Sequence, residues 1–348
     1  MSEGIEMVDG VEMYRIPGLE SLEPFLMTVV SSSDLWMFIS SSGGLTAGRV
    51  DRDHCLFPYE TDDRLHAASG RVGSATVLRV RVGDAEATWT PFVGSDARAE
   101  RSLLKSLLGD AVVFEETRRD LGLTYRSRWS PSTEFGWVRT ASITDRGAGA
   151  TVDLVDGLVG VMPWGIDVSM QQQMSNLANA YRRSEIVEPG LGVFTLEASI
   201  VDRPEPAEAL RANTVWATGL DDAELTLDSQ AIVRAAQGRA FESTALHTGR
   251  PGSFIVGATI DLAPSEERRW HVVADAAHTH SDVAALRALL ASGPDLMQQV
   301  DDSIRRSSEA LRNIVATADG FQATGSPTTD AHHVANTLFN VMRGGCLL

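Results

Sequence analysis

The chain has 348 residues, of which 43% are hydrophobic and 22% charged, as in ordinary soluble globular proteins. Its 30 basic and 47 acidic side chains give a formal net charge of −17, which argues against nucleic acid or an anionic membrane surface as a partner. No apolar run approaches the ~20 residues of a membrane span. The acidic N-terminal segment lacks the apolar core of a secretory signal, so we expect a cytoplasmic protein. The two cysteines, Cys55 and Cys346, are too few for a disulfide framework or a structural zinc site.

Short extended segments separated by turns occupy most of the chain from residue 25 onward. Alternation of apolar and charged residues is clearest from Thr76 to Val82, and Gly83-Asp84 turns the chain back into the next segment. Many such segments without regular strand–helix alternation predict a mainly β protein built on a large antiparallel sandwich. The expected strands are 26–30, 35–39, 76–82, 85–90, 123–129, 135–144, 151–155, 193–201, 214–217, 223–227, 240–247, 253–262 and 268–274.

Helical periodicity marks a smaller number of segments. Leucines predict a helix near 98–108, and 171–183 has an apolar face opposite an amide-rich one. After His280 the chain becomes helical, with Ser281 as the expected N-cap of 282–291 and Gly293-Pro294 as its end. A long amphipathic helix follows over about 296–315, and Asp330 is expected to cap a final helix that runs to Arg343.

This change of pattern divides the chain into three parts. We expect a β-sandwich domain over 1–277, a helical linker over 278–320, and the start of a further domain over 321–348. The final helix carries an apolar stripe with nothing downstream to cover it, formed by Val334, Leu338, Val341 and Met342. We therefore expect a C-terminal partner domain that this chain lacks. The alternative is a helix that folds back onto the sandwich.

The segment from Ser40 to His66 concentrates charges of both signs and aromatic residues around a Gly43-Gly44 turn. Such a mixture suits a polar ligand or an interface rich in hydrogen bonds. A loop held in shape by internal Arg–Asp pairs is the structural alternative. The candidate binding or interface residues here are Arg49, Asp51, Arg52, Asp53, His54, Tyr59, Asp62, Asp63 and His66.

The order of residues in this segment resembles the N-terminal domain of inverting glycoside phosphorylases of the cellobiose phosphorylase type. The matching positions are Gly43, Gly44, Thr46, Ala47, Gly48, Arg52, Leu56, Pro58, Tyr59 and Asp62. The chain departs from the family pattern at Asp53-His54 and at Asp63-Arg64, which leaves the sugar and the linkage open.

The resemblance implies a galactose-mutarotase-like β-supersandwich, a helical linker and then an (α/α)6 barrel. In that family the carboxylic general acid and the phosphate-binding residues lie on the barrel, so this chain alone is expected not to be catalytic. No catalytic residue and no cofactor are assigned. The implied partners are a sugar or oligosaccharide, the missing barrel domain and a second copy in a homodimer.

In this interpretation the carboxylates of the charged segment accept hydrogen bonds from sugar hydroxyls, and Tyr59 stacks on a pyranose face. On the final helix Asn336, Asn340 and Arg343 share a polar face that could meet the same site or simply face solvent. A metal site formed by Asp51, Asp53, His54 and His66 is a further alternative, although the spacing fits no zinc pattern.

Two other classes of function stay open. A free-standing sugar mutarotase or epimerase would use His247 or His271, with Glu242 or Asp261 as a partner. A non-catalytic carbohydrate-binding module would use some of the seven tryptophans, most of which fall in expected strands and suit the core better. These are Trp36, Trp89, Trp129, Trp137, Trp164, Trp216 and Trp270.

Overall fold

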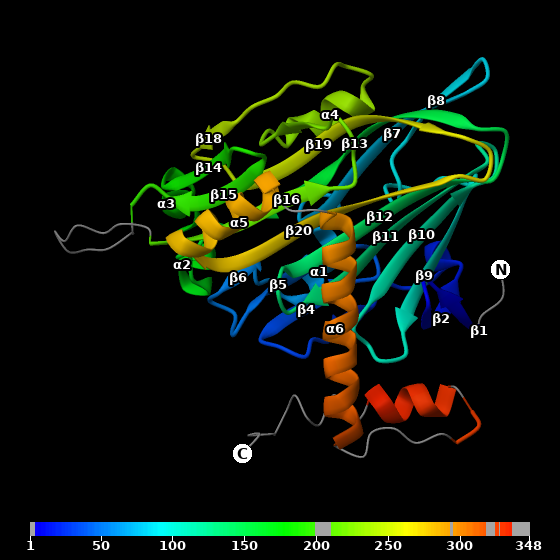
Figure 1. The fold of residues 1–348 in the computed structure, drawn as a ribbon, viewed down its shortest axis with the longest axis horizontal. Coiled ribbons are helices and arrows are strands. Elements are labelled where there is room, and N and C mark those ends of the chain that lie inside the picture. The colour runs from blue at the N-terminus through cyan, green and yellow to red at the C-terminus, as the bar shows by residue number, and fades with distance from the viewer. Residues whose placement is uncertain (1–3, 199–209, 293–294, 318–323, 327, 336–348) are drawn as a thin grey trace.

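The computed structural model describes residues 4–198, 210–292, 295–317, 324–326 and 328–335 (Figure 1). Three sheets dominate it, and every strand pairing in them is antiparallel. The predicted mainly β, antiparallel architecture followed by helices is confirmed.

The largest sheet has 11 strands. In spatial order they are β1 (Gly4–Val8), β2 (Val11–Pro17), β9 (Ala99–Ser106), β10 (Val112–Arg118), β11 (Leu123–Ser132), β12 (Gly136–Asp145), β20 (Glu267–Thr279), β16 (Arg211–Thr218), β15 (Leu191–Leu196), β14 (Arg182–Val187) and β18 (Leu246–Thr248).

A 5-stranded sheet and a 4-stranded sheet share the main hydrophobic core with the large one. The first consists of β17 (Glu224–Thr226), β19 (Gly252–Leu262), β13 (Ala150–Val161), β7 (Gly73–Val82) and β8 (Ala85–Trp89). The second consists of β3 (Leu26–Val29), β4 (Leu35–Ser40), β5 (Leu45–Arg49) and β6 (Cys55–Phe57).

The main hydrophobic core lies between these sheets. Five of the seven tryptophans have 2% or less of their surface exposed, which agrees with a packing role. They are Trp89, Trp129, Trp137 and Trp270 in this core, and Trp216 on the helix-covered face of the large sheet. Burial of aromatic side chains of this size is a large source of stability.

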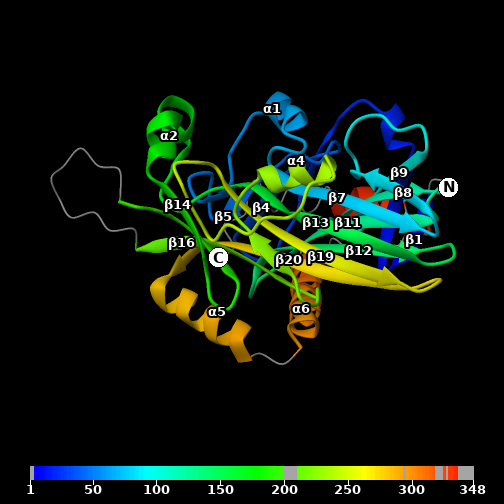
Figure 2. The ribbon, with the colours of Figure 1, turned by 90° about the horizontal axis from the view of Figure 1, so that it is seen from above.

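Helices cover the outside of the sandwich. Figure 2 shows α5 (His280–Ser292) and α6 (Leu296–Thr317) on one side of the large sheet, with the 5-stranded sheet on the other. Their apolar faces form a second core with the large sheet, in which Val300 of α6 and Val273 of β20 are fully buried. The shorter helices are η1 (Leu19–Ser21), α1 (Asp62–Ala67), α2 (Val168–Gln173), α3 (Ser175–Ala180) and α4 (Gln230–Ala236). Within the described ranges, no helix is long and apolar enough to cross a membrane.

Some sequence-based boundaries were wrong. The helix expected near 98–108 is strand β9, because Leu103 faces the inter-sheet core while Leu104 faces a cluster with Met13 on the opposite side. Consecutive side chains that point to opposite sides have the two-residue repeat of a strand. The helix expected over 171–183 is broken into α2 and α3, and the strand expected over 240–247 is limited to β18.

The cap of α5 lies two residues earlier than expected. Asp282 N donates to Thr279 Oγ1 (3.3 Å), and Thr279 N donates to Asp282 Oδ2 (2.8 Å). This reciprocal capping box gives the N-cap role to Thr279 instead of Ser281. Strand β20 therefore continues to Thr279 and passes directly into α5.

The described part of the last helix covers residues 328–335. Val334 is buried in a small cluster with Leu108 of the large sheet's β9–β10 turn and with Leu311 and Val315 of α6. This helix therefore contacts the rest of the chain at Val334. Leu338, Val341 and Met342 lie outside the described residues, so the division into three parts stays a prediction.

Candidate functional site

The charged segment is more regular than a loop. Leu45–Arg49 and Cys55–Phe57 form the adjacent strands β5 and β6, joined by a turn, and residues 62–67 form α1. Gly48 is required in β5, because a Cβ there would lie 2.3 Å from the His54 carbonyl oxygen across the turn. The segment thus presents its charges from three places: the end of β5, the turn, and α1.

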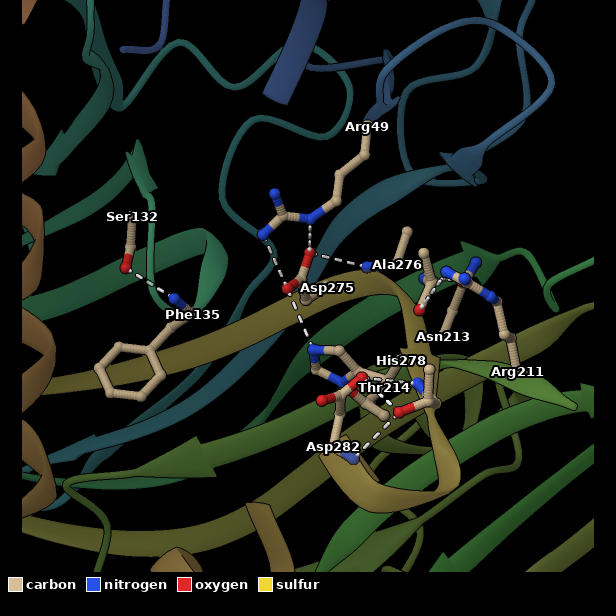
Figure 3. Close-up of polar contacts among 12 residues, drawn as sticks. Arg49, Ser132, Phe135, Arg211, Asn213, Thr214, Asp275, Ala276, His278 and Asp282 are labelled. Atoms are coloured by element: carbon tan, nitrogen blue, oxygen red, sulfur yellow. Dashed lines mark hydrogen bonds and ion pairs between the residues drawn. The ribbon is translucent and has the colours of Figure 1, made fainter. Parts of the chain in front are cut away.

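Arg49 holds the end of β5 to the large sheet. Its Nε and Nη2 donate to the two carboxylate oxygens of Asp275 (2.7 and 2.9 Å; Figure 3). Its Nη1 donates to Asp34 Oδ1 (2.6 Å). Such bidentate pairs fix geometry as well as charge. Arg49 therefore has the shape-fixing role that the structural alternative gave to Arg–Asp pairs, but its main partner, Asp275, lies outside the segment and not within it.

Asp275 is almost fully occupied. Besides Arg49 it accepts hydrogen bonds from the Ala276 amide (2.8 Å) and from His278 Nε2 (3.1 Å) (Figure 3). Burial alone would raise the pKa of Asp275, but the hydrogen bonds from His278 and Arg49 outweigh it and hold this pKa below its usual value. A carboxylate held ionised by four donors is suited to positioning and unsuited to general acid catalysis.

A bulge in β20 creates this arrangement. The pairing with β16 shifts register so that Ala276 and Ala277 lie opposite the single residue Asn213, and Ala277 adopts a φ of 72°. Asn213 Oδ1 accepts from the Ala277 amide (3.2 Å), while its Nδ2 donates to the carbonyls of Cys55 (2.9 Å) and Met162 (2.8 Å). One fully buried amide therefore ties the bulge to β6 of the charged segment.

A hollow of about 450 Å³ lies beside these residues. Its polar groups are already engaged: His278 Nδ1 lies 3.0 Å from Thr214 Oγ1, Asp282 caps α5, and Glu134 pairs with Arg306 (2.6 Å). The side chains that line this hollow hold the charged segment in place, and they leave little unused hydrogen-bonding capacity for a ligand. Its lining comprises Arg49, Glu134, Phe135, Trp216, Asp275, Ala276, Ala277, His278, Asp282, Ala285, Leu286 and Leu289.

The turn beyond Arg49 projects outward. Val50 is 68% exposed and adopts a φ of 59°, which is rare for a β-branched residue. Asp51, Arg52 and Asp53 are exposed, and Asp51 Oδ1 lies 2.8 Å from His54 Nδ1. The turn therefore leaves the Arg52 guanidinium at the surface. The left-handed backbone of Val50 in the same turn is of the strained kind that concentrates at functional sites.

The base of the turn rests on the segment before α2. The His54 ring stacks on Trp164 with centroids 4.9 Å apart, and the Arg211 guanidinium lies 5.5 Å from the centroid of the same indole. Asp53 Oδ1 accepts from the Val168 amide (3.0 Å). Cys55, just behind the turn, is buried, and burial raises the pKa of its thiol to about 12, so it is not an activated nucleophile.

A second hollow, of about 330 Å³, brings predicted site residues together on the other side of the segment. Tyr59 and Asp62 line it, and Gln172 of the amide-rich helix α2 joins them from more than a hundred residues away in sequence. The Tyr59 ring meets Trp36 edge-on, with centroids 5.8 Å apart. The full lining is Leu26, Phe38, Thr46, Tyr59, Glu60, Thr61, Asp62, Leu65 and Gln172. We call it the Tyr59 hollow.

The remaining predicted residues of the segment lie on α1, outside this hollow. Asp63 is exposed and accepts from Thr61 Oγ1 (2.5 Å), which lowers the pKa of its carboxyl. His66 is half-buried, with Nδ1 2.6 Å from Ser40 Oγ and Nε2 3.3 Å from Asp62 Oδ1. Both support the helix and its junction with β4. Asn336, Asn340 and Arg343 lie outside the described residues.

The structure gives the two candidate histidines of the mutarotase hypothesis other partners. His271 is fully buried under α6, with Nδ1 2.9 Å from Thr140 Oγ1 and Nε2 3.3 Å from Asp301 Oδ1. His247 Nδ1 lies 3.2 Å from the Leu227 carbonyl. Asp261, proposed as a partner, instead accepts from Thr151 (2.7 Å).

The alternative metal site is not formed by the structure. In the part of the chain that can be placed, no three His, Cys, Asp or Glu side chains converge as metal ligands. His66 faces Ser40 and Asp62, whereas His54 faces Asp51 and Trp164.

Three important residues were missed at the sequence level: Asp275, Asn213 and Gln172. Asp275 interrupts the apolar run from Val272 to Ala277, and a polar residue at such a place in a buried strand is a signal that a partner exists. Asn213 lies beside other polar residues, Arg211 and Thr214, so no such contrast marks it. Gln172 lies in the amide-rich stretch that the sequence did distinguish, but its proximity to Tyr59 required the tertiary structure.

No family model matches this sequence, and no curated protein matches it significantly. Solved structures do resemble the fold. A bacterial glucoamylase complexed with acarbose aligns with a TM-score of 0.49 at 8% identity, covering 94% of this chain and 43% of that one. A family GH92 α-mannosidase from Bacteroides thetaiotaomicron aligns at 0.37 and 10% identity, covering 94% and 37%.

A human-microbiome protein assigned as a kojibiose phosphorylase aligns with a TM-score of 0.38 at 11% identity, covering 69% of this chain and 28% of that one. Each of the three carries the name of a carbohydrate-active enzyme. This chain spans less than half the length of each. With all three TM-scores below 0.5, the phosphorylase family stays a prediction from sequence.

Proposed function

We propose that this chain is the carbohydrate-contacting β-sandwich and linker part of a carbohydrate-active enzyme, an inverting glycoside phosphorylase or hydrolase whose reaction is carried out on a separate barrel domain. In this proposal the polypeptide binds an oligosaccharide and supports the barrel, and it does not perform the chemistry itself.

The observation that carries the proposal is the composition of the Tyr59 hollow. A sugar ring has an apolar face and a rim of hydroxyls, and protein sites for it pair an aromatic ring with carboxylates and amides. The hollow supplies Tyr59, the carboxylates of Glu60 and Asp62, and the Gln172 amide within about 330 Å³. Two distant segments converge to provide this set.

The exposed turn supports the second half of the proposal. Arg49 and Asn213 fix the base of the turn to the large sheet through buried contacts. The tip then extends Arg52 outward next to Asp51 and Asp53. We propose that this tip contacts the barrel domain, or the sugar bound to it, and that a homodimer forms around the same sandwich.

The test is a calorimetric titration of the whole chain with maltotriose and cellotriose, which differ in linkage. Gln172→Ala and its neighbour Gln173→Ala are both exposed on α2, but only Gln172 lines the hollow. We expect Q172A to weaken binding about fivefold, the effect of one hydrogen bond, and Q173A to leave it unchanged. Tyr59→Ala should abolish detectable binding.

The proposal fails if neither trisaccharide binds saturably, or if Q172A and Q173A both bind as the wild type does. Acceleration of glucose anomer interconversion by the chain alone would instead favour the mutarotase hypothesis.

A further inference from the structure

A third hollow, of about 590 Å³, lies within the range of small-molecule sites and is separate from the Tyr59 hollow. Figure 2 shows α4 lying over β7 and β13, on which it packs. The hollow extends between α4 and the loop of residues 90–94. Its floor comes from both principal sheets, through β7, β10 and β11. None of the functions considered above uses it.

Its walls are mainly apolar and aromatic. Phe92 meets Phe114 edge-on with centroids 5.8 Å apart, and the Phe92 and Tyr125 centroids are 6.3 Å apart. At the mouth Val93 is 56% exposed and Val233 is 46% exposed. Large apolar side chains left in water around a hollow indicate a surface that an apolar ligand covers.

Phe92 is held against this hollow at a conformational cost. Its φ is 61°, a left-handed value that is strained for a bulky residue, and such values cluster at ligand-binding sites. The Phe92 amide donates to Glu116 Oε2 (2.6 Å). Glu116 is 1% exposed and is itself fixed by Trp89 Nε1 (2.6 Å) and Arg101 Nε (2.8 Å). A buried carboxylate therefore fixes the backbone that presents the aromatic wall.

The inner end of the hollow is polar but uncharged. Thr76 Oγ1 donates to the fully buried Asp156 (2.6 Å), so the Tyr125 hydroxyl, 3.0 Å from Thr76, donates to Thr76. This order leaves the Tyr125 oxygen as an acceptor, and Ser127 lies on the same strand beside it. Among the described residues that line the hollow, none is acidic and Arg71 is the one cation.

We propose that this hollow binds a neutral aromatic compound that carries a hydroxyl group, of the phenol or naphthol class. Its ring packs among Phe92, Phe114 and Tyr125, and its hydroxyl donates to the oxygen atoms at the inner end. Neutral ligands fit because a carboxylate ligand would bury a charge without a cation at that end, and an ammonium ligand would find no carboxylate in the lining. This proposal is independent of the carbohydrate function.

Calorimetric titration of the whole chain with 2-naphthol, naphthalene-2-carboxylate and D-glucose tests the site and its ligand class. Two substitutions on α4 form a matched pair: Val233→Trp fills the mouth, while Gln230→Trp places the same side chain on the exposed start of the helix, outside the hollow. We expect saturable 1:1 binding of 2-naphthol that V233W weakens at least tenfold and that Q230W leaves unchanged.

The carboxylate should bind at least tenfold more weakly than 2-naphthol, and glucose should not bind at this site. Three outcomes would overturn the proposal: no saturable binding of 2-naphthol, equal affinity in V233W and the wild type, or glucose binding that V233W removes. Thermal unfolding of both variants shows whether the fold is kept. Ser127→Ala, which removes one oxygen atom inside the hollow and adds no bulk, should weaken 2-naphthol binding about fivefold.

Discussion

Two arginine–aspartate pairs in this molecule have opposite surroundings. Arg139 and Asp156 are fully buried between the sheets, where Asp156 also accepts from Thr76 Oγ1 (2.6 Å) and Trp270 Nε1 (2.6 Å). Arg49 and Asp275 lie at the edge of an open hollow, with 16% and 5% of their side chains exposed. The first pair joins the two principal sheets, whereas the second attaches a surface segment to one of them.

The comparison shows what each pair can contribute. The inner pair joins opposite sheets and reaches the third hollow only through Thr76, so its main role is to specify how the sheets face each other. The outer pair is followed directly by an exposed turn with Val50 in a left-handed conformation. It therefore fixes the base of a segment whose other residues are available to a partner.

The largest expected effect comes from breaking the inner pair. Arg139→Met leaves Asp156 buried without its cation, and we expect the free energy of unfolding to fall by about 4 kcal/mol. Urea unfolding followed by tryptophan fluorescence measures it. Glu86→Gln, which removes the exposed partner of Arg79, should change stability by less than about 0.5 kcal/mol. A loss below about 1 kcal/mol in R139M would contradict the role given to this pair.

Breaking the outer pair should cost less. Asp275→Asn removes the charge that Arg49 and His278 contact, and we expect a loss of about 3 kcal/mol at pH 7, softened because Arg49 keeps Asp34. Equal stability of D275N and the wild type at pH 7 would show that the segment is fixed by other contacts.

The same substitution should change the pH dependence. Hydrogen bonds hold the folded-state pKa of Asp275 below the ~3.9 of an unfolded aspartate, so its stabilising contribution is complete above about pH 5 and is lost as pH falls through the folded-state value. Urea unfolding at pH 7, 5, 4 and 3.5 should therefore show a smaller acid loss in D275N than in the wild type. Parallel curves would contradict this assignment.

The smallest expected effect is a gain. Val50→Gly relieves the left-handed strain of an exposed residue, and we expect the free energy of unfolding to rise by about 0.5 kcal/mol. Val50→Ala keeps a Cβ and should show no such gain. A loss of stability in V50G would mean that the valine side chain makes a contact the turn needs.

The sequence predicted much of the sheet architecture, because alternation within strands such as β7 and β13 is a local property. It misassigned β9, where Leu103 and Leu104 are buried on opposite faces and resemble a helical stripe. Alternation also fails to identify short strands such as β6, in which every residue is buried.

The candidate site was predictable only in part, because local sequence patterns do not show which distant residues meet. The charged segment stood out by composition, and Tyr59 and Asp62 do line one hollow. The partner of Arg49, Asp275, lies 226 residues away at a bulge; its place among apolar residues signals that it has some partner, but no local pattern identifies Arg49 as that partner. Long-range pairing of this kind is decided by how the sheets assemble.

The most direct test of the central claim is an NMR titration of the ¹⁵N-labelled chain with maltotriose and cellotriose. The account predicts saturable amide shifts at Tyr59 to Asp62 and around Gln172 for at least one of the two, and no shifts there in Tyr59→Ala. Saturable shifts confined to other parts of the sandwich, or none at all with either sugar, would contradict it.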